Sequence, residues 1–202
     1  MARSKRRRSS PKKPSSTLRV CLSEPGAPSL VGMGPATKKN LVLTGFMGTG
    51  KTTVGRTLAE RLGFDFVDTD AMIESQAGPI GEIFERDGEE AFREMERRTA
   101  RELAGRAGLV IATGGRMMLD PECAACLKPA AHVVCLNATP ETILERIGDT
   151  AQRPLLDVGD APTRVRELLA ERAEGYGRFI AVDTEGLSPD EVADAVMARL
   201  GL

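Results

Sequence analysis

The stretch LVLTGFMGTGKTT, residues 41–53, combines an apolar run with three glycines and a Lys-Thr-Thr sequence. Residues 45–52 match the phosphate-loop pattern G-x-x-x-x-G-K-S/T without a mismatch. The pattern follows a short apolar run, typical of a buried strand, and precedes an amphipathic segment, typical of a helix, as the motif requires. Glycines allow successive backbone N–H groups to turn toward one phosphate. The stretch therefore predicts a strand, a phosphate-binding loop and a helix in direct succession.

The side chains of this loop suit a magnesium nucleotide. Lys51 would reach the β and γ phosphates, the Thr52 hydroxyl would ligate Mg²⁺, and the helix N-terminus would add its partial positive charge. The sequence contains no Asn-Lys-x-Asp motif of the guanine-selecting GTPases, which favours ATP over GTP. We therefore expect ATP and Mg²⁺ as cofactors. The residues expected to hold the nucleotide here are Gly48, Thr49, Gly50, Lys51, Thr52 and Thr53.

Two aspartates follow the second apolar run, in the sequence VDTDAMIE at 67–74. We expect Asp68 and Asp70 to lie on the same side of an extended chain, because side chains alternate along a strand. Open α/β sheets bind their ligands at the carboxyl ends of the strands. We therefore expect one carboxylate near Mg²⁺ and the other near a hydroxyl group that accepts a phosphoryl group.

Short apolar runs and longer amphipathic segments alternate along the rest of the chain, which predicts a parallel sheet with crossover helices. We expect an α/β fold with a five-stranded parallel sheet, helices on both faces and a mobile lid near residues 148–160. Helices are expected at 51–62 and 89–104, and after Thr139 and Ser188. The runs expected to form strands are 40–44, 64–68, 108–113, 131–136 and 178–184.

Charge is unevenly distributed along the chain. Residues 1–40 contain ten Lys or Arg and one acid, so 18 of the 28 basic and 28 of the 29 acidic residues remain from residue 41 onward, a net charge of −10. Residues 1–39 are rich in Ser and Pro and are predicted to be a disordered basic tail, and residues 40–202 to be one kinase domain. The tail could attach to nucleic acid or to a membrane surface, but we favour a solvated segment or a translation start at Met33.

Nothing in the sequence indicates a secreted or membrane protein. The tail lacks the apolar core of a signal peptide, and no run of ~18 apolar residues could span a bilayer. With one histidine, His132, and one CAAC pair, we expect neither a zinc site nor a redox site but free, buried or half-buried thiols in a reducing compartment. We expect a cytoplasmic monomer without nucleic-acid or membrane partners. The cysteines are Cys21, Cys123, Cys126 and Cys135.

Further short motifs follow the phosphate loop in a fixed order. They are DTD at 68–70, FRE at 92–94, TGG at 113–115, RPLL at 153–156, and ER at 171–172 with Tyr176 four residues beyond. From Leu41 to about Leu200 the chain resembles the shikimate kinases in the order and spacing of these motifs. The resemblance implies an α/β fold of the phosphate-loop nucleoside monophosphate kinase type. It also implies phosphorylation of a small carboxylated polyol by ATP, with shikimate giving shikimate 3-phosphate in aromatic amino-acid biosynthesis.

The resemblance also implies roles for single residues. Asp68 would organise Mg²⁺ through water, and Asp70 would bind the acceptor hydroxyl group. Arg93 and Arg172 would clamp the acceptor carboxylate, a task that suits planar bidentate donors. Arg153 would be the lid arginine that contacts the transferring phosphate.

Backbone and adenine contacts are implied in the same way. Gly114 and Gly115 would let the backbone approach the acceptor ring, and Arg146 and Pro189 would bracket the adenine. The residues expected to act in catalysis are Lys51, Asp70 and Arg153.

One position departs from the family pattern, in which a third glycine follows the first two. Arg116 stands there and would narrow the acceptor pocket, add an anion contact or point to solvent. We favour the solvent-facing orientation, which keeps shikimate as the acceptor. A kinase for another sugar acid such as gluconate, and a nucleotide-binding module without turnover, are the alternatives.

Overall fold

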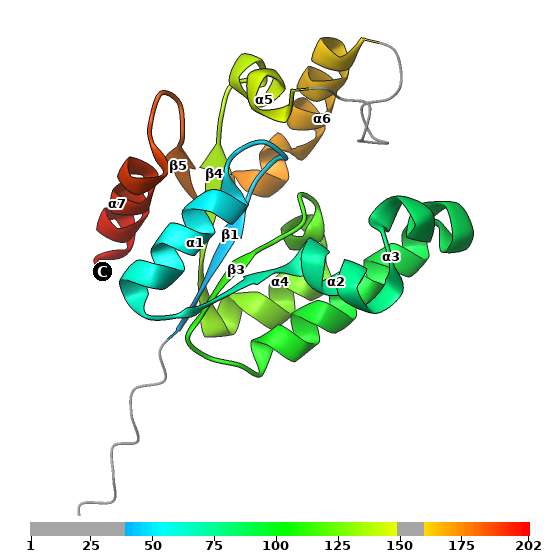
Figure 1. The fold of residues 1–202 in the computed structure, drawn as a ribbon, viewed down its shortest axis with the longest axis horizontal. Helices are drawn as coiled ribbons and strands as arrows, with labels where there is room; N and C mark the ends of the chain where they lie inside the picture. Colours follow the sequence, from blue (N-terminus) through cyan, green and yellow to red (C-terminus); the bar gives the residue numbers. More distant parts are fainter. Residues whose placement is uncertain (1–38, 149–159) are drawn as a thin grey trace, which may run out of the picture. The chain divides into compact units, whose positions relative to one another are not determined.

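The computed structural model of the protein describes residues 39–148 and 160–202. All but the last residue of the predicted tail, and residues 149–159 with Arg153 and most of the predicted lid, lie outside these ranges. Within them, five parallel strands form one sheet in the order β2-β3-β1-β4-β5 (Figure 1). All five predicted strands are confirmed, and their ends differ from the prediction by two residues at most. The strands are β1 (Asn40–Thr44), β2 (Asp65–Asp68), β3 (Leu109–Ala112), β4 (Ala131–Asn137) and β5 (Ile180–Asp183).

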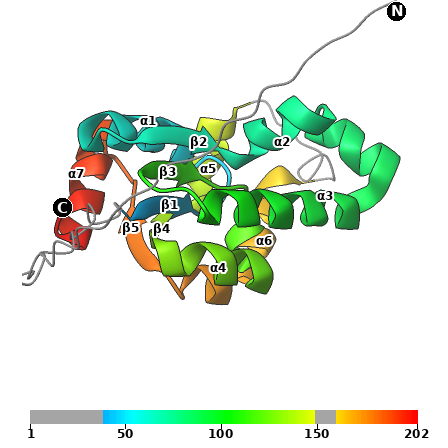
Figure 2. The same ribbon diagram turned by 90° about the horizontal axis from the view of Figure 1, so that it is seen from below.

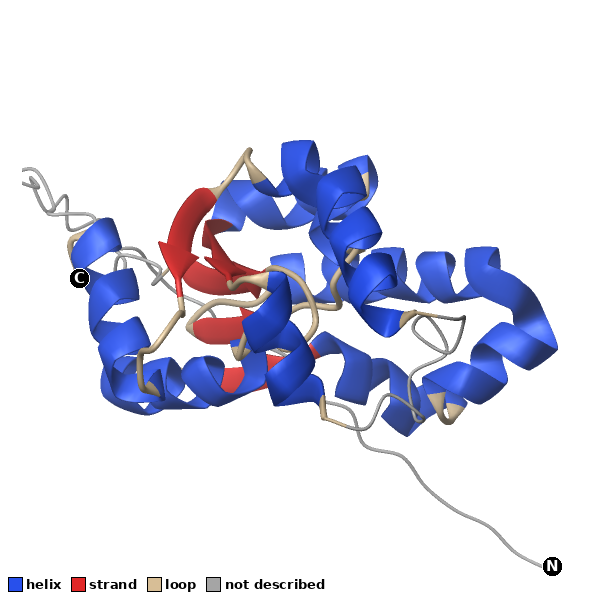
Figure 3. Cartoon of the chain, turned by 90° about the horizontal axis from the view of Figure 1, so that it is seen from above, coloured by secondary structure: helices blue, strands red, loops and turns tan. Residues whose placement is uncertain are grey.

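The described ranges also contain seven α-helices, namely α1 (Lys51–Leu62), α2 (Thr69–Ala77), α3 (Ile80–Ala104), α4 (Pro121–Leu127), α5 (Pro140–Ile147), α6 (Ala161–Tyr176) and α7 (Pro189–Leu200). Helices cover both faces of the sheet, as predicted (Figures 2 and 3). α1 and α7 pack on one face, and α3 and α4 pack on the other. α5 and α6 pack against the phosphate loop, beyond the carboxyl end of β4 (Figure 1).

Alternation along β1 divides the core between the two faces of the sheet. Leu41 and Leu43 pack with α1 and α7, whereas Val42 packs with α3 and α4. All three side chains are buried, as a central strand of a parallel sheet requires. Gly55 lets α1 approach β2, because a Cβ there would lie 2.6 Å from the Phe66 ring. The strand and helix that flank the phosphate loop are therefore firmly packed.

The helix predicted at 89–104 is confirmed, but it belongs to a longer element. α3 starts at Ile80 and is interrupted at Gly88, where φ is 82° and ψ is 171°. The predicted start lies just after this break, where regular helix resumes. The sequence pattern does not predict α2, which buries only Thr69 and Ile73 and so lacks a clear apolar stripe.

Three of the cysteines lie in the described part of the chain, and all three are free thiols, as predicted. Cys123 and Cys135 are buried, and burial raises the pKa of each to about 12. Cys126 is half-buried. The two buried thiols are therefore protonated at neutral pH and are not nucleophiles. No helix within the described ranges is long and apolar enough to cross a membrane.

Candidate active site

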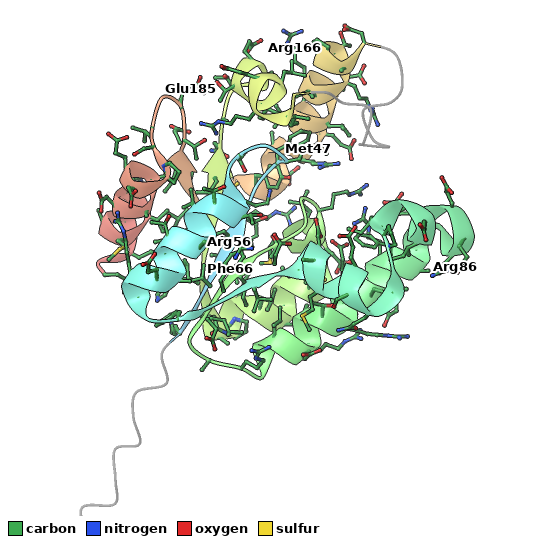
Figure 4. The ribbon with its side chains drawn as sticks, viewed as in Figure 1. Met47, Arg56, Phe66, Arg86, Arg166 and Glu185 are labelled. Carbon is green, nitrogen blue, oxygen red and sulfur yellow. The ribbon has the colours of Figure 1, made fainter. Side chains whose placement is uncertain are left out.

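The phosphate loop joins β1 to α1, and close contacts with β4 set its shape. Gly45 has a φ of 131°, and a Cβ there would lie 2.3 Å from the Leu136 carbonyl oxygen, so only glycine fits. The Thr49 hydroxyl is buried and donates to the Phe46 carbonyl at 2.8 Å. Met47, at the tip of the loop, packs against the cluster formed by α5 and α6 (Figure 4). The Thr49 side chain thus stabilises the loop, and the backbone N–H of Thr49 is left for the predicted phosphate contact.

Lys51 begins α1, and its ammonium group folds back over the loop. Nζ donates to the carbonyl oxygens of Gly45 at 3.0 Å and Phe46 at 2.7 Å. Gly48 and Gly50 have positive φ values of 77° and 87°, which curve the backbone around the same space. An anion bound there would meet an ammonium group, backbone N–H groups and a helix N-terminus together.

Thr52 and Asp68 bring two hard oxygen atoms together next to the loop. Thr52 Oγ1 donates to Asp68 Oδ2 at 2.8 Å. Mg²⁺ usually keeps several waters and takes one or two protein oxygens together with nucleotide phosphates. No group of three or more His, Cys, Asp or Glu in the described ranges could hold a metal ion. The residues present therefore fit a Mg²⁺ ion that binds together with its nucleotide.

Asp68 and Asp70 both line the candidate site, but not in the way that strand alternation predicts. Asp68 ends β2 and caps α2, and its Oδ1 accepts from the backbone N–H groups of Asp70 at 3.1 Å and Ala71 at 3.4 Å. Asp70 lies in the first turn of α2, so the expectation of an extended chain at this point is wrong. The helix start turns the chain over the end of the sheet, and this turn brings both carboxylates to one cavity.

One cavity of about 790 Å³ is lined by every predicted site residue of the described ranges. The phosphate loop, Arg146 and Pro189 line the part expected to hold the nucleotide. The residues brought together are Gly48, Thr49, Gly50, Lys51, Thr52, Thr53, Asp68, Asp70, Arg93, Gly114, Gly115, Arg146, Arg172 and Pro189. Arg153 lies outside the described residues.

Arg146, near the end of α5, is held by the turn between β5 and α7. Its Nη1 donates to the Thr184 hydroxyl at 2.8 Å, and its Nη2 donates to the Thr184 carbonyl at 2.7 Å. Glu185, in the same turn, accepts from the Thr139 backbone N–H at 3.2 Å (Figure 4). These contacts tie α5 to the turn that leads to Pro189, so that Arg146 and Pro189 keep their places in the cavity wall.

Arg93, on α3, is held by two glutamates of the same helix. Its Nη1 donates to Glu96 Oε2 at 2.6 Å, and its Nε and Nη2 donate to Glu89 Oε1 at 3.2 and 2.8 Å. The Glu96 side chain is 2% exposed, whereas the Glu89 side chain is 54% exposed. Neither acid belongs to a predicted site, although acids three and four residues from an arginine on a helix could have indicated them.

Asp70 and Arg172 line the cavity, and each has a side-chain atom that is buried and unsatisfied. Within the described ranges, Asp70 Oδ1 and Arg172 Nε lack a hydrogen-bond partner. Arg172 projects from α6 over the Phe46 ring, with Cζ 5.2 Å from the ring centroid. Buried polar atoms are costly when unpaired, and a ligand or water usually satisfies them. The cavity therefore offers a hydrogen-bond acceptor and a donor to a bound molecule.

Gly114 lies against the carboxyl groups of Asp70 and Glu96. A Cβ at this position would lie 2.6 Å from Asp70 Oδ1 and 3.0 Å from Glu96 Oε1, so any side chain would collide with them. Burial raises the pKa of both carboxyl groups. The charge of Asp68 raises the pKa of Asp70 further, whereas nearby cations oppose the shift. Asp70 is therefore a better proton acceptor than an exposed aspartate.

Gly115 is held through its carbonyl oxygen, which accepts a hydrogen bond from Tyr176 Oη at 2.6 Å. Tyr176 is buried at the end of α6, and burial raises its pKa to about 12, so it donates at neutral pH. A Cβ at Gly115 would lie 3.5 Å from Arg172 Nη1. α6 thus positions both Arg172 and the backbone that follows β3. The sequence marks Tyr176 as part of a motif, without a role.

Arg116 lies at the rim of the cavity. Its side chain is 45% exposed, and its Nη1 lies 3.5 Å from Glu89 Oε1. Arg116 also lines a neighbouring cavity of about 500 Å³, together with Glu89, Arg93 and Arg97. The predicted solvent-facing orientation is therefore correct for only part of the side chain, because its charged end lies beside Glu89.

Comparison with known sequences identifies the family. A family model described as shikimate kinase matches residues 47–201. The chain belongs to the shikimate kinase family. Shikimate kinases from Thermodesulfovibrio yellowstonii and Thermus thermophilus are 45% and 44% identical to it over 161 and 163 residues. These matches cover 79% of this chain in both cases, and 93% and 89% of the two relatives. The family that the motifs predict is confirmed.

Solved structures of the family share the fold. A shikimate kinase from Acinetobacter baumannii in complex with shikimate has a TM-score of 0.76 at 37% identity, over 82% of this chain and 94% of that one. A gluconokinase from Sinorhizobium meliloti has a TM-score of 0.55 at 22% identity, over 81% of this chain and 94% of that one, and shows the fold alone. The predicted phosphate-loop kinase fold is confirmed, and the gluconate alternative is not favoured.

Proposed function

We propose that this shikimate kinase family member transfers the γ-phosphoryl group of ATP to a hydroxyl group of shikimate, which yields ADP and shikimate 3-phosphate. The proposal is carried by the pair of buried, unsatisfied atoms in the cavity, Asp70 Oδ1 and Arg172 Nε, which have no partner among the described residues. Shikimate has hydroxyl groups that can donate to Asp70 and a carboxylate that can accept from Arg172. One bound molecule would satisfy both atoms, and a solved relative was in complex with shikimate.

The phosphate loop is proposed to hold the triphosphate of ATP. Lys51, which already lines the loop, would contact the β and γ phosphates. Thr52 would bind Mg²⁺ directly and Asp68 through water, and the ion would neutralise charge on the phosphoryl group in transfer. The helix N-terminus and the loop N–H groups would complete the anion site.

Arg146 and Pro189 are proposed to contact the adenine. Both line the cavity next to the loop, and Arg146 is held there by two hydrogen bonds to Thr184. The flat faces of a guanidinium group and a proline ring suit a planar base. Arg153 lies outside the described residues, and its role as the lid arginine stays a prediction.

The acceptor carboxylate is proposed to bind Arg93 and Arg172, which come to the cavity from α3 and α6. Charge-assisted hydrogen bonds from a planar guanidinium group give such a contact both strength and direction. Gly114 and Gly115 leave the end of β3 without side chains, so that the acceptor ring can lie against the backbone. The ring is then held between an arginine pair and Asp70.

Asp70 is proposed to accept the proton of the reacting hydroxyl group on Oδ1. This atom is buried, has no partner within the described ranges, and belongs to a carboxyl group whose pKa is raised by burial. A raised pKa makes the carboxylate a stronger base while the new O–P bond forms. Because phosphoryl transfer depends mainly on positioning, the hydrogen bond from the hydroxyl group to Asp70 also aims the attacking oxygen.

The test combines the purified full chain with MgATP and either shikimate or gluconate. ADP release is followed in a coupled assay, and the phosphorylated product is identified by ³¹P NMR. We expect ADP and shikimate 3-phosphate in equal amounts, and no turnover of gluconate. Turnover of gluconate alone would establish the sugar-acid alternative. If neither acceptor led to ADP release, the result would support a nucleotide-binding module without turnover.

A further inference from the structure

We propose that Arg116 is a positioning residue that pairs with the Glu89 carboxylate when the acceptor's own carboxylate binds Arg93. The inference rests on the proposed function, because it requires an acceptor that carries a carboxylate. It concerns the one position at which the sequence departs from the family motif, where Arg116 replaces a third glycine. Arg116 acts through Glu89, so it is a positioning residue and not a catalytic one.

The Glu89 carboxylate occupies the atoms of Arg93 to which the acceptor carboxylate is proposed to bind. In Arg93, Nε and Nη2 form the edge of the guanidinium group that makes bidentate contacts with carboxylates. Both atoms donate to Glu89 Oε1. Glu96 accepts a hydrogen bond from Arg93 Nη1 at 2.6 Å and is buried, so it stays in place. The Glu89 side chain is more than half exposed, so the displaced carboxylate would remain in contact with solvent. An acceptor that takes this edge of Arg93 therefore displaces Glu89.

Arg116 is the cation that can form an ion pair with the displaced Glu89 carboxylate. The oxygen that accepts from Arg93 lies 3.5 Å from Arg116 Nη1, so a small side-chain rotation transfers it. The hydrogen bond from Arg93, and the charges of Arg93, Arg116 and Arg172, lower the pKa of Glu89, so it stays ionised during the exchange. Arg97, which lines the neighbouring cavity, already donates to two other carboxylates.

The exchange leaves a guanidinium partner for each carboxylate that competes for these arginines. With the acceptor bound, the carboxylates of Glu89, Glu96 and the acceptor face the guanidinium groups of Arg93, Arg116 and Arg172. With glycine in place of Arg116, the same carboxylates would share the two remaining guanidinium groups. The displaced Glu89 would then lie beside the acceptor carboxylate without a cation of its own in the described part of this cavity. Such juxtaposed like charges weaken binding.

The test measures steady-state kinetics in Arg116→Gln, Arg116→Lys, Glu89→Gln and the double variant Glu89→Gln/Arg116→Gln. We expect Arg116→Gln to raise KM for shikimate about fivefold to tenfold, with kcat and KM for ATP within about twofold of native values. Arg116→Lys keeps the charge and should restore most of the affinity. In the Glu89→Gln background no carboxylate needs a new partner, so adding Arg116→Gln should change KM less than about twofold.

Arg98→Gln is the matched control, because Arg98 is an exposed α3 arginine whose Nε lies 3.6 Å from Glu94. Its kinetics should remain native. An unchanged KM for shikimate in Arg116→Gln would overturn the proposal, and so would an equal rise in the Glu89→Gln background. A gain in kcat/KM for shikimate in Arg116→Gly would also overturn it, because Arg116 would then obstruct the acceptor.

Calorimetric titration of the same variants with shikimate separates this inference from the proposed function. If the native protein binds shikimate without turnover, the proposed function is wrong, and the Kd series still decides the role of Arg116. A Kd for shikimate that rises in Arg116→Gln, but not when Arg116→Gln is added to Glu89→Gln, supports the exchange. A Kd that is unchanged in Arg116→Gln overturns it. A native protein that does not bind shikimate overturns both.

Discussion

The phosphate-binding part and the acceptor part of the cavity are built in different ways. The phosphate-binding part is one contiguous segment, whose shape depends on backbone contacts such as that of Gly45 with Leu136. The acceptor part takes side chains from α2, α3, the turn after β3 and α6, which lie far apart in the sequence (Figure 1). Ion pairs around Arg93 and the hydrogen bond from Tyr176 to Gly115 hold it together.

This contrast predicts different tolerance to change. A site made by the backbone works only when the loop has one particular shape, so its key side chain should be indispensable. A site made by separate charged side chains can lose one member and keep the others, so its substitutions should have graded effects. Single positions of the acceptor part can therefore vary within the fold while the phosphate-binding part stays the same, and Arg116 in place of a glycine is one such position.

The largest expected effect is that of Lys51→Ala. Removal of the ammonium group from the loop should lower kcat by more than ~10³-fold, because it takes away the side-chain cation that is proposed to contact the β and γ phosphates. The circular dichroism spectrum should stay native. If turnover remained near native with an intact fold, the assignment of the phosphate loop would be wrong. The contrast between the phosphate-binding part and the acceptor part of the cavity would then not hold.

Asp70→Asn should lower kcat by ~10²–10⁴-fold, because it removes the proposed proton acceptor. At neutral pH it should raise the free energy of unfolding by ~1 kcal/mol, or Tm by ~2–4 °C, because a buried carboxylate is replaced by a neutral amide. The folded-state pKa of Asp70 is raised by burial, so its ionised form costs stability above that pKa. The cost disappears as the pH falls below the unfolded-state value.

Urea denaturation of the native protein and Asp70→Asn, at neutral and at acidic pH, measures this difference. The gain in stability should be present at neutral pH and absent at acidic pH. A variant that is less stable than the native protein at neutral pH would mean that Asp70 is held by contacts that burial alone does not reveal.

Arg172→Ala should have a graded effect at the acceptor part. We expect a loss of ~2–4 kcal/mol in transition-state stabilisation for shikimate, about 30-fold to 1000-fold in kcat/KM, with KM for ATP unchanged. The control is Arg166→Ala on the same helix, an exposed arginine that pairs with Glu141 at 2.9 Å (Figure 4). Arg93→Ala should behave like Arg172→Ala. Equal losses for ATP and shikimate would move these arginines out of the acceptor pocket.

Tyr176→Phe should have the smallest effect. It removes the donor to the Gly115 carbonyl and keeps the ring, which should cost ~1 kcal/mol of stability. The turn after β3 would then be less well placed, and kcat/KM for shikimate should fall about threefold to tenfold. Steady-state kinetics and thermal unfolding of the same preparation measure both. Native kinetics would show that the turn needs no support from α6.

The sequence predicts the phosphate-binding part almost completely, because all of its residues follow one another. Strand, loop and helix start where the motif places them, and Lys51 and Thr52 lie in one cavity with Asp68. The five strands are also predictable, since each is a short apolar run between amphipathic segments. These features depend on local periodicity and on backbone conformation, which a single sequence displays directly.

The acceptor part is only partly predictable. Family motifs point to Arg93 and Arg172, but the pairing of Arg93 with Glu89 and Glu96 depends on which helix face is buried. Strand alternation places Asp70 in the right cavity for the wrong reason, because the capping Asp68 starts a helix at the point where the sequence pattern predicts a continuing strand. The bond from Tyr176 to Gly115 joins residues 61 positions apart, and no local pattern reveals such a contact.

The placement of unlike charges around Gly114 has a consequence for regiochemistry. In the proposed complex, a hydroxy acid bound the other way round would bring its carboxylate to Asp70 and leave the arginines facing a neutral hydroxyl group. Repulsion and lost ion pairs would both oppose that pose. Of several hydroxyl groups on one ring, the one that reaches Asp70 in this complex is then set by its distance from the acid group that the arginines hold. The choice is made on binding, before any bond to phosphorus begins to form.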